Sequence, residues 1–239
     1  MYKRILLKLS GEALHEETGS HTIDVECLDS LAHVIADLNK RGIEVAVVIG
    51  AGNIWRGKLA SRIGIEPIPA DFMGMLGTVI NAVAMSSALK KYNVEGKVYS
   101  SIPPIPEVTT AYNRDAVLKS LSEGKVVFLA GGTGKPFYTT DTAATLMAID
   151  LGCEVILMGK NGVNGVYTSD PTKDPNAKFL PVITYKQMLE MKLQIMDLSA
   201  IELIKDKDIE VRVFSMDNPE NFMKAAEGEN FGTVCKKGE

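Results

Sequence analysis

The sequence predicts an α/β fold in which helices cover both faces of a mostly parallel central sheet. Two observations lead to this prediction: short apolar runs alternate with longer amphipathic segments, and glycine-bearing loops separate them. The chain of 239 residues, 46% of them hydrophobic and 23% charged, has the size and composition of a soluble globular protein. We therefore expect residues 1–239 to form a single α/β domain with two lobes.

Strands are expected where short apolar runs lie between polar segments. The run EVAVVI at Glu44–Ile49 has apolar residues at consecutive positions, which predicts a strand buried on both faces of the sheet. The other runs of this kind are Lys3–Leu9, Lys97–Ser100, Val126–Ala130 and Glu154–Met158.

Two helices are indicated by the spacing of apolar residues. In Val25–Arg41 the helical periodicity follows Asp24, a suitable N-cap, and ends before Gly42. Met73–Tyr92 predicts a long helix rich in Met, Ala and Val. Its apolar part, Met73–Leu89, is expected to be either buried core or a subunit interface.

A third helix is expected over Thr142–Leu151, with Thr140 or Asp141 as its N-cap. Asp71 also stands just ahead of a helical segment, so the ordinary role of either aspartate is to cap a helix. The polar segment Asn161–Lys178 interrupts the alternation and predicts a hairpin or a lid.

Composition excludes several classes of function. The net charge of −4, without a long basic run, argues against nucleic acid as the main partner. Three scattered cysteines, at positions 27, 153 and 235, predict neither a disulfide framework nor a metal motif. No segment has the pattern of a secretory signal or approaches the roughly 18 to 20 apolar residues of a membrane span. We expect a cytoplasmic protein without a membrane partner.

Four polar, glycine-bearing loops follow predicted strands. In open α/β sheets, ligands bind beyond the carboxyl ends of the strands, and glycine lets backbone N–H groups approach an anion closely. The four loops therefore predict an anion site together. They are Lys8–Gly11, Gly50–Gly57, Ala130–Asp141 and Gly159–Gly162.

The third loop reads AGGTGKPFYTTD and contains a Gly-Lys pair, as a P-loop does. A Walker A motif needs a glycine five places before that pair and a Ser or Thr after it. Here Leu129 and Pro136 occupy those places, so the loop is not a Walker A loop.

Two cations in these loops have both an ordinary and a functional interpretation. Lys8 lies between two leucines in a predicted strand. It is either a buried ammonium that requires an anionic partner or an exposed residue on an edge strand. Arg56 follows a glycine loop and is either a phosphate ligand or a surface arginine.

The histidines argue against hydrolysis by a catalytic triad. His15, His21 and His33 lack the Ser or Cys neighbourhood of a nucleophile–base pair, and their spacing fits no HxxxH metal motif. A reaction that depends on charge neutralisation and positioning fits better, and phosphoryl transfer is the leading example.

With these loops identified, the chain resembles the bacterial-type UMP kinases of the amino acid kinase family almost from end to end. This resemblance implies an amino acid kinase-like three-layer sandwich. It is carried by six ordered blocks: YKRILLKLSGEAL at Tyr2–Leu14, VVIGAGNIWRG at Val47–Gly57, DFMGMLGTVINA at Asp71–Ala82, GGTGKPFYTTDTAA at Gly131–Ala144, GVYTSDPTKDP at Gly165–Pro175 and MDLSA at Met196–Ala200.

The resemblance implies transfer of the γ-phosphoryl group of ATP to UMP, with Mg²⁺ bound to ATP, as a step of pyrimidine nucleotide biosynthesis. It implies a UMP-binding N-terminal half, an ATP-binding C-terminal half and a homohexamer. It also makes GTP and UTP candidate effectors. The segment Glu16–Thr22, near which family members carry GTP contacts, matches the family pattern poorly.

Family roles carry over to individual positions. The implied catalytic residues are Lys8, Arg56, Asp141, Lys160 and Asp197, of which Lys8 would meet the transferring group and Asp197 would hold the lysines in place. The implied ATP-binding residues are Lys8, Leu9, Ser10, Gly11, Gly52, Arg56, Asn161, Tyr167 and Asp170. The implied UMP-binding residues are Ala51, Asp71, Thr133, Gly134, Lys135, Pro136, Phe137, Tyr138, Thr139 and Thr140. No metal ligand is assigned.

Four positions depart from the family pattern. Ala51 replaces a glycine and places a small Cβ toward the nucleotide cleft, and Trp55 replaces a phenylalanine. Lys135 replaces an asparagine and adds a cation near the acceptor, while Asn164 replaces an aspartate.

Three rival functions have weaker support. Kinases of the same family with other acceptors lack the GTGxPFxTTD loop. A non-catalytic nucleotide-binding regulator would be favoured if Lys8, Arg56, Asp141 or Asp197 were missing, and all four are present. A nicotinamide-dependent oxidoreductase would have a GxGxxG motif after the first strand, and no such motif follows the first predicted strand of this sequence.

Overall fold

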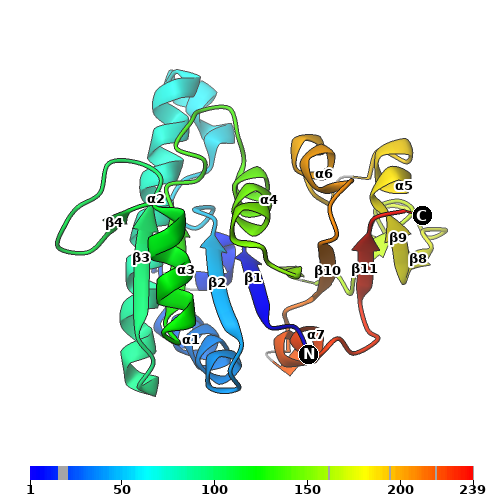
Figure 1. The fold of residues 1–239 in the computed structure, drawn as a ribbon. Coiled ribbons are helices and arrows are strands. Elements are labelled where there is room, and N and C mark those ends of the chain that lie inside the picture. Colours follow the sequence, from blue (N-terminus) through cyan, green and yellow to red (C-terminus); the bar gives the residue numbers. More distant parts are fainter. Residues whose placement is uncertain (16–20, 161, 194, 219, 239) are drawn as a thin grey trace.

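The computed structural model describes residues 1–15, 21–160, 162–193, 195–218 and 220–238, in which one nine-stranded sheet lies between two layers of helices (Figure 1). Neighbouring strands are parallel except for the pair β10 and β11. In order across the sheet the strands are β4 (Thr110–Ala111), β3 (Gly96–Ser100), β5 (Val126–Ala130), β2 (Glu44–Ile49), β1 (Arg4–Leu9), β6 (Val155–Lys160), β10 (Glu210–Ser215), β11 (Thr233–Lys236) and β9 (Val182–Thr184). This arrangement confirms the predicted α/β fold class.

Helices cover both faces, and each face has its own hydrophobic core. One core is completed by α1 (Val25–Lys40), α2 (Pro67–Ala88) and α7 (Glu220–Glu227). The other is completed by α3 (Arg114–Ser122), α4 (Thr140–Leu151), α5 (Tyr185–Glu190) and α6 (Leu198–Ile204). Short 3₁₀ helices are η1 (Gly11–Leu14), η2 (Gly57–Ile63) and η3 (Leu89–Tyr92).

Strand β1 lies in the middle of the sheet and contributes to both cores. It pairs in parallel with β2 on one side and with β6 on the other. Successive side chains alternate between the faces, so Ile5, Leu7 and Leu9 pack in one core and Leu6 in the other. Lys8 shares the face of Leu6 and is only 9% exposed. The edge-strand alternative for Lys8 is therefore wrong.

The predicted strands and the first helix are confirmed, with boundary shifts of one or two residues. Helix α1 begins after Asp24, whose carboxylate accepts a hydrogen bond from Cys27 N at 2.9 Å. It ends at Lys40, and Gly42 follows with a φ of 83°, a left-handed conformation that glycine adopts without strain.

Two predicted helix starts are wrong. Helix α2 begins at Pro67 rather than Met73, because proline suits the first turn of a helix, where its missing N–H costs nothing. Asp71 therefore lies inside α2 and does not cap it. Helix α4 is capped by Thr139, one residue earlier than expected, whose hydroxyl accepts hydrogen bonds from the first-turn N–H groups of the helix.

The described part of the polar segment, residues 162–178, belongs to a hairpin, as one of the segment's two interpretations predicted. Strands β7 (Val166–Tyr167) and β8 (Phe179–Leu180) pair antiparallel as a separate two-stranded sheet. The sequence analysis did not identify β10, an interior strand. Arg212 lies in the middle of β10 and is buried, donating to Tyr2 Oη and to the Glu229 carbonyl at 2.8 Å each.

Helix α2 corrects the expectation that no segment approaches a membrane span. Together with η3 it forms a 26-residue helical stretch, Pro67–Tyr92, with a mean hydropathy of 1.5, which is long and apolar enough to cross a membrane. Half of its most apolar window is buried inside the protein. The buried side chains, including Met75, Val79 and Met85, pack in the same core as β2, β3 and β5, so α2 is a core helix of this fold.

A substitution in β1 tests how far stability depends on this doubly buried strand. Leu7→Ala removes a fully buried side chain and is expected to lower the free energy of unfolding by about 2–5 kcal/mol in urea titrations. Val25→Ala, at an exposed position of α1, should change it by less than about 0.5 kcal/mol. Equal effects of the two substitutions would contradict the placement of β1 at the centre of the core.

Candidate active site

The first two glycine loops pack against each other at the carboxyl edge of the sheet. Gly50 N donates to the Leu9 carbonyl at 2.9 Å. A Cβ placed on Gly11 would lie 2.5 Å from Asn53 Oδ1, 2.6 Å from the Gly50 carbonyl oxygen and 2.7 Å from Gly52 N. Only glycine fits at position 11, and this close approach brings the backbone of the two loops together.

Asn81 on α2 fixes the second loop and was missed by the sequence analysis. Its side chain is fully buried and donates to the Gly50 carbonyl at 2.8 Å. It also exchanges two amide hydrogen bonds with Asn53, at 2.8 and 3.1 Å. The signal in the sequence was an amide at an interior position of an otherwise apolar helix, because a buried amide requires partners.

Lys8 and Asp141 form an ion pair at the centre of the site. Lys8 Nζ lies 2.5 Å from Asp141 Oδ1, and the two side chains are 11% and 16% exposed. The structure thus supplies the anionic partner that a buried Lys8 requires. Asp141 lies in the first turn of α4, so the pair joins the third glycine loop to the central strand.

Lys160 ends β6 close to this ion pair. Its ammonium donates to the Ile195 carbonyl at 3.1 Å. Burial lowers the pKa of Lys160, and the nearby charge of Lys8 lowers it further, while Asp141 opposes both effects. The charge of Asp141 thus acts on both ammonium groups, although its ion pair is with Lys8.

Asp197 is the N-cap of α6 and lies against the first turn of α4. Its carboxylate accepts hydrogen bonds from Ala200 N at 2.8 Å, from Thr142 Oγ1 at 3.0 and 3.1 Å, and from the hydroxyl of Thr139. The hydrogen bonds that the structure describes for Asp197 therefore go to helix starts, whereas the family resemblance implies that it holds lysines.

Arg56 is held at the surface by a glutamate that the sequence analysis did not single out. Its guanidinium lies 2.8 Å from Glu12 Oε1 and donates to the Gly52 carbonyl at 3.3 Å. Ser10 caps η1 by accepting from Glu12 N at 3.4 Å. Leu9, an implied ATP contact, has its side chain in the hydrophobic core, which leaves only its backbone for a ligand.

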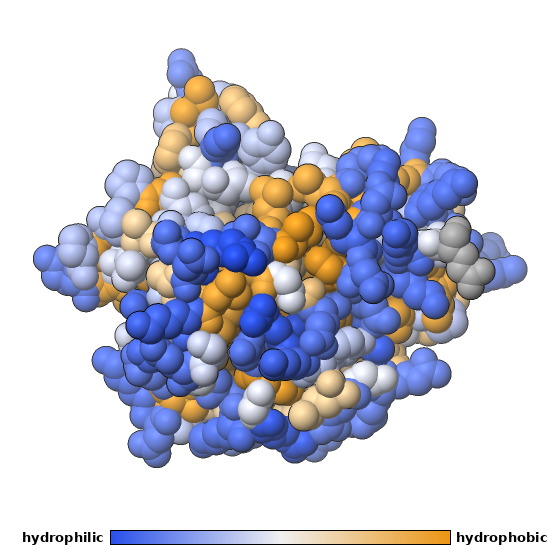
Figure 2. Space-filling view, viewed as in Figure 1, coloured by the Kyte–Doolittle hydropathy of each residue, from blue (hydrophilic) through white to orange (hydrophobic). Residues whose placement is uncertain are grey.

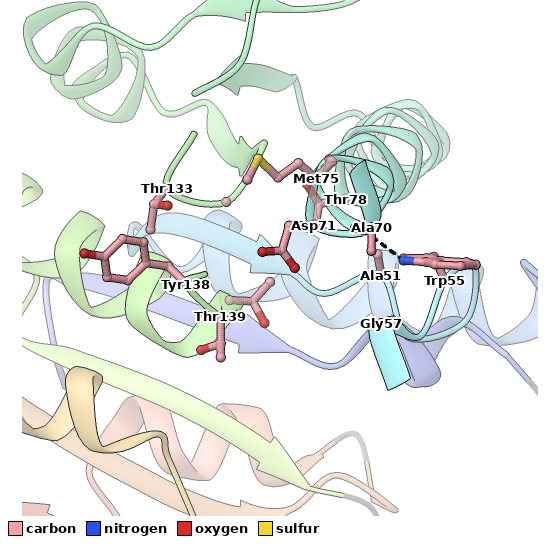
Figure 3. A pocket seen from close by; sticks show the side chains of 13 residues that line it. Ala51, Trp55, Gly57, Ala70, Asp71, Met75, Thr78, Thr133, Tyr138 and Thr139 are labelled. Atoms are coloured by element: carbon pink, nitrogen blue, oxygen red, sulfur yellow. Dashed lines mark hydrogen bonds between the residues drawn. The ribbon is translucent and has the colours of Figure 1, made fainter. Parts of the chain in front are cut away.

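A cavity of about 160 Å³, here called the α2 cavity, lies between α2 and the third glycine loop (Figure 3). In Figure 3 the carboxylate of Asp71 and the side chains of Thr133 and Thr139 lie around it. Six of the implied UMP-binding residues line this cavity. They are Ala51, Asp71, Thr133, Tyr138, Thr139 and Thr140.

The other four implied UMP contacts do not line the α2 cavity. Gly134 turns the loop with a φ of 73°, and a Cβ there would lie 2.6 Å from the Ser101 carbonyl oxygen. Lys135 is exposed, and its backbone exchanges hydrogen bonds with the hydroxyl of Thr133. Pro136 and Phe137 complete this part of the loop outside the cavity.

Phe137 has an unusual backbone that depends on Asp71. Its φ is 70°, a left-handed conformation that costs a bulky residue of order 1–3 kcal/mol. The side chain is 71% exposed, so packing does not explain this conformation. Instead, Phe137 N donates to Asp71 Oδ2 at 2.6 Å. Asp71 thus holds the loop in shape while its carboxylate lines the cavity.

Several residues that line the α2 cavity were not predicted. Thr78 joins α2 to the loop, because its hydroxyl accepts from Gly131 N at 2.8 Å and donates to the Met75 carbonyl. Trp55 donates to the Ala70 carbonyl at 2.9 Å. These residues line the cavity because α2 packs against the glycine loops, and the spacing of apolar residues does not predict that packing. The further lining residues are Gly57, Ala70, Gly74, Met75 and Gly132.

Ala51 is accommodated by a glycine on α2. Ala51 lines the α2 cavity and is 9% exposed. A Cβ placed on Gly77 would lie 2.8 Å from the Cβ of Ala51, which is closer than real side chains approach. The methyl group of Ala51 therefore occupies the space that Gly77 leaves.

Two further cavities lie on the C-terminal side of the ion pair. The α6 cavity, of about 870 Å³, is lined by Asp141, Lys160 and Asp197 together with apolar residues of segment 189–198. Figure 2 shows apolar side chains gathered on the surface between α4 and α6. The hairpin cavity, of about 440 Å³, is lined by Tyr167 and Asp170. Asn161, an implied ATP contact, lies outside the described residues.

Comparison with known proteins establishes the family. The sequence profile of the Amino acid kinase family matches residues 3–215, which is most of the chain. The chain belongs to the amino acid kinase family. Its Lys8–Asp141 ion pair and its glycine loops lie at the carboxyl ends of the parallel strands.

Within the amino acid kinase family, relatives over the full length are known. A protein of Mycoplasmopsis pulmonis called uridylate kinase is 48% identical over 90% of this chain and 89% of its own length. The crystal structure of UMP kinase from Bacillus anthracis superposes with a TM-score of 0.95 at 37% identity, covering 100% of this chain and 97% of that one. The crystal structure of UMP kinase from Ureaplasma parvum superposes with a TM-score of 0.93 at 36% sequence identity. The match covers 99% of this chain and 100% of that one.

Lys160 is expected to lower stability while it serves the site. Folding lowers the pKa of Lys160. At pH values between that lowered pKa and the ordinary lysine pKa of about 10.4, the unfolded chain therefore binds more protons than the folded chain does. The destabilisation is complete below this window and disappears as the pH rises through it. Lys160→Met should therefore raise the free energy of unfolding at pH 7 by about 1 kcal/mol, measured in urea.

The matched control is Lys186→Met, which replaces a side chain that is 83% exposed. That variant should unfold at the same urea concentration as the wild type. If Lys160→Met is no more stable than Lys186→Met at pH 7, or if its advantage grows above pH 10, the interpretation of Lys160 as a buried, costly ammonium is wrong.

Proposed function

We propose that this protein transfers the γ-phosphoryl group of ATP to UMP, giving UDP and ADP. The observation that carries the proposal is the α2 cavity, which is lined by five residues of the GTGKPFYTTD loop, and the last residue of that loop, Asp141, pairs with Lys8. The family match and the full-length relatives named uridylate kinase support it. A kinase of the same family with another acceptor would not need this loop.

The proposed reaction needs no general base. A phosphate acceptor is already ionised at neutral pH, so its oxygen can attack without losing a proton, and no histidine is among the described residues lining the three cavities. The barrier is instead electrostatic, since a charged acceptor must approach a charged donor. Lys8, Lys160 and Arg56 supply positive charge, and Lys8 keeps further N–H donors beyond the one facing Asp141.

Mg²⁺ is proposed to enter with ATP. In the described residues no group of three His, Cys, Asp or Glu side chains forms a metal cage. Magnesium in kinases is commonly held by one or two carboxylates and the substrate phosphates, which suits this arrangement. Asp141 fits that role, because it is a carboxylate that lines the α6 cavity next to Lys8. Bound there, the ion would neutralise phosphate charge.

The division of substrates follows the sheet. We propose one domain in which the N-terminal half, with α2 and the third glycine loop, binds UMP. The C-terminal half would bind ATP, with the adenosine in the hairpin cavity. The phosphates of ATP would reach the loops of the N-terminal half, near Ser10, Gly11, Gly52 and Arg56. We further propose a cytoplasmic location.

A non-catalytic regulator is the alternative from another class of function. It would bind nucleotide without turnover, and the same assay decides between the two. GTP and UTP are the effectors to test by addition to that assay.

Replacement of Lys8 tests the proposed reaction. Purified protein with Mg²⁺ should form ADP in a manner that depends on UMP, and Lys8→Ala should lower kcat by on the order of a hundredfold or more. The variant should keep its fold by circular dichroism but melt at a lower temperature, because Asp141 loses its partner.

The control is Lys3→Ala, at an exposed position just before the same strand, which should keep wild-type turnover. Folded wild-type protein that forms no ADP in response to UMP would refute the proposed function. A near-wild-type kcat in Lys8→Ala would remove Lys8 from the mechanism.

We also propose self-association, as the family resemblance implies for a homohexamer. Ile68, Phe72, Leu76 and Ile80 form an exposed stripe along α2, here called the α2 stripe. These positions are four residues apart and therefore share one helix face. Asp71 is the only charged residue within α2, so the stripe lacks the charges that keep a surface helix in water. A second copy of the same helix is a matching partner for such a face.

Disruption of the α2 stripe should dissociate the assembly. Light scattering of the wild type is expected to give a mass of about six chains, and Leu76→Glu should reduce it because burying a carboxylate in an apolar interface is costly. Val25→Glu, on α1, should leave the mass unchanged. A wild type that scatters as a single chain would overturn the proposed hexamer.

A further inference from the structure

Three residues at the start of α4, its N-cap Thr139 and the first-turn residues Asp141 and Thr142, connect different parts of the site. Thr139 caps the helix by accepting hydrogen bonds from Asp141 N at 3.1 Å and Thr142 N at 3.3 Å. Asp141 turns toward Lys8 on the central strand, with its Oδ1 2.5 Å from Lys8 Nζ. Thr142 turns to the carboxylate of Asp197. A shift of this one turn would therefore move the ion pair.

Thr142 makes a buried contact with a charged partner. Its side chain is 1% exposed, and its hydroxyl lies 3.0 and 3.1 Å from the two carboxylate oxygens of Asp197. A hydroxyl bonded to an ionised carboxylate forms a stronger hydrogen bond than a neutral pair does, and burial shields it from competing water. This contact fixes the first turn of α4 against α6.

Asp197 receives hydrogen bonds from both helices at once. It caps α6 through Ala200 N at 2.8 Å and accepts the hydroxyls of Thr139 and Thr142 from α4. Its described hydrogen bonds thus reach Lys8 only indirectly, through the helix turn that carries Asp141. Since α4 follows the acceptor loop and α6 lines the cavity on the ATP side, the contact links the two proposed substrate regions.

We propose that Thr142 is a positioning residue for phosphoryl transfer. Its hydroxyl fastens Asp197 and α6 to the turn of α4 that places Asp141 against Lys8. This inference rests on the proposed function, because it concerns the geometry of that same site. Loss of the hydroxyl should displace the Lys8–Asp141 pair while the separate nucleotide pockets keep their shape, so turnover should fall more than substrate binding.

Thr145 provides a matched control in the same helix. It lies three residues after Thr142, is fully buried, and its hydroxyl has no hydrogen-bond partner among the described residues. Thr→Val at either position preserves side-chain shape and removes one hydroxyl. The two variants differ in whether that hydroxyl has a partner, so their comparison isolates the contact with Asp197.

The test measures kcat and the KM values for ATP and UMP in Thr142→Val, Thr142→Ser and Thr145→Val of the full chain. Thr142→Val should lower kcat on the order of tenfold to a hundredfold, because small displacements of reacting groups have effects of this size. Both KM values should change by less than about threefold, since uniform binding is kept. Thr142→Ser, which keeps the hydroxyl, should restore turnover, and Thr145→Val should match the wild type.

Amide hydrogen exchange provides a readout that does not require turnover. Thr142→Val should speed exchange at the first turns of both α4 and α6, and Thr145→Val should not. If Thr142→Val does not fold, Thr142→Cys replaces it, because its thiol is only a weak donor of similar size. The expected loss of kcat is the same.

Three outcomes overturn the positioning role: a wild-type kcat in Thr142→Val, a Thr142→Ser variant as impaired as Thr142→Val, or equal exchange in Thr142→Val and Thr145→Val. A wild type without UMP-dependent turnover overturns the proposed function instead. In that case hydrogen exchange alone decides whether Thr142 fastens the two helices.

Discussion

An ammonium group in the middle of a parallel sheet is the constraint on which this structure depends. Lys8 lies on a strand whose residues Ile5, Leu6, Leu7 and Leu9 are buried among apolar neighbours. Removing the charge of Lys8 from water is costly unless an anion is close. Asp141 meets that need at 2.5 Å. The start of α4 must therefore lie above β1, and the glycine loop before α4 must bend to deliver it there. Lys160, a second ammonium group near this pair, adds positive charge at the cavity that Asp141 lines.

Other elements of the site serve to keep this arrangement rigid. Gly11 allows the first two loops to meet without a side chain between them, and Asn81 holds the second loop from the side of α2. Asp71 bonds the strained backbone of Phe137, which fixes the third loop. Binding groups held in this way lose little freedom when a ligand arrives, and such preorganisation is what electrostatic catalysis requires.

The sequence predicted the fold class because strands buried on both faces leave unbroken apolar runs, as Glu44–Ile49 does. It missed β10, since Arg212 interrupts that run, and two of the acceptors that make its burial possible, Tyr2 and the Glu229 carbonyl, are distant in the chain. The start of α2 was misplaced because two prolines obscure its first turn. In the site, loop residues such as Thr133 and Tyr138, which the family resemblance implies bind UMP, line the α2 cavity, and their binding of UMP stays a prediction. Thr78 and Glu12 were not foreseen, because their roles depend on which helix faces which loop.

The contact between Ala51 and Gly77 has an evolutionary consequence. The two positions lie on different elements, yet only one of them can carry a Cβ, because two would stand 2.8 Å apart. Alanine at position 51 is thus tolerated on the background of glycine at position 77, and gaining a methyl group at 77 first requires losing the one at 51. The pair is epistatic, so the order in which substitutions arise along a lineage decides which of them can persist.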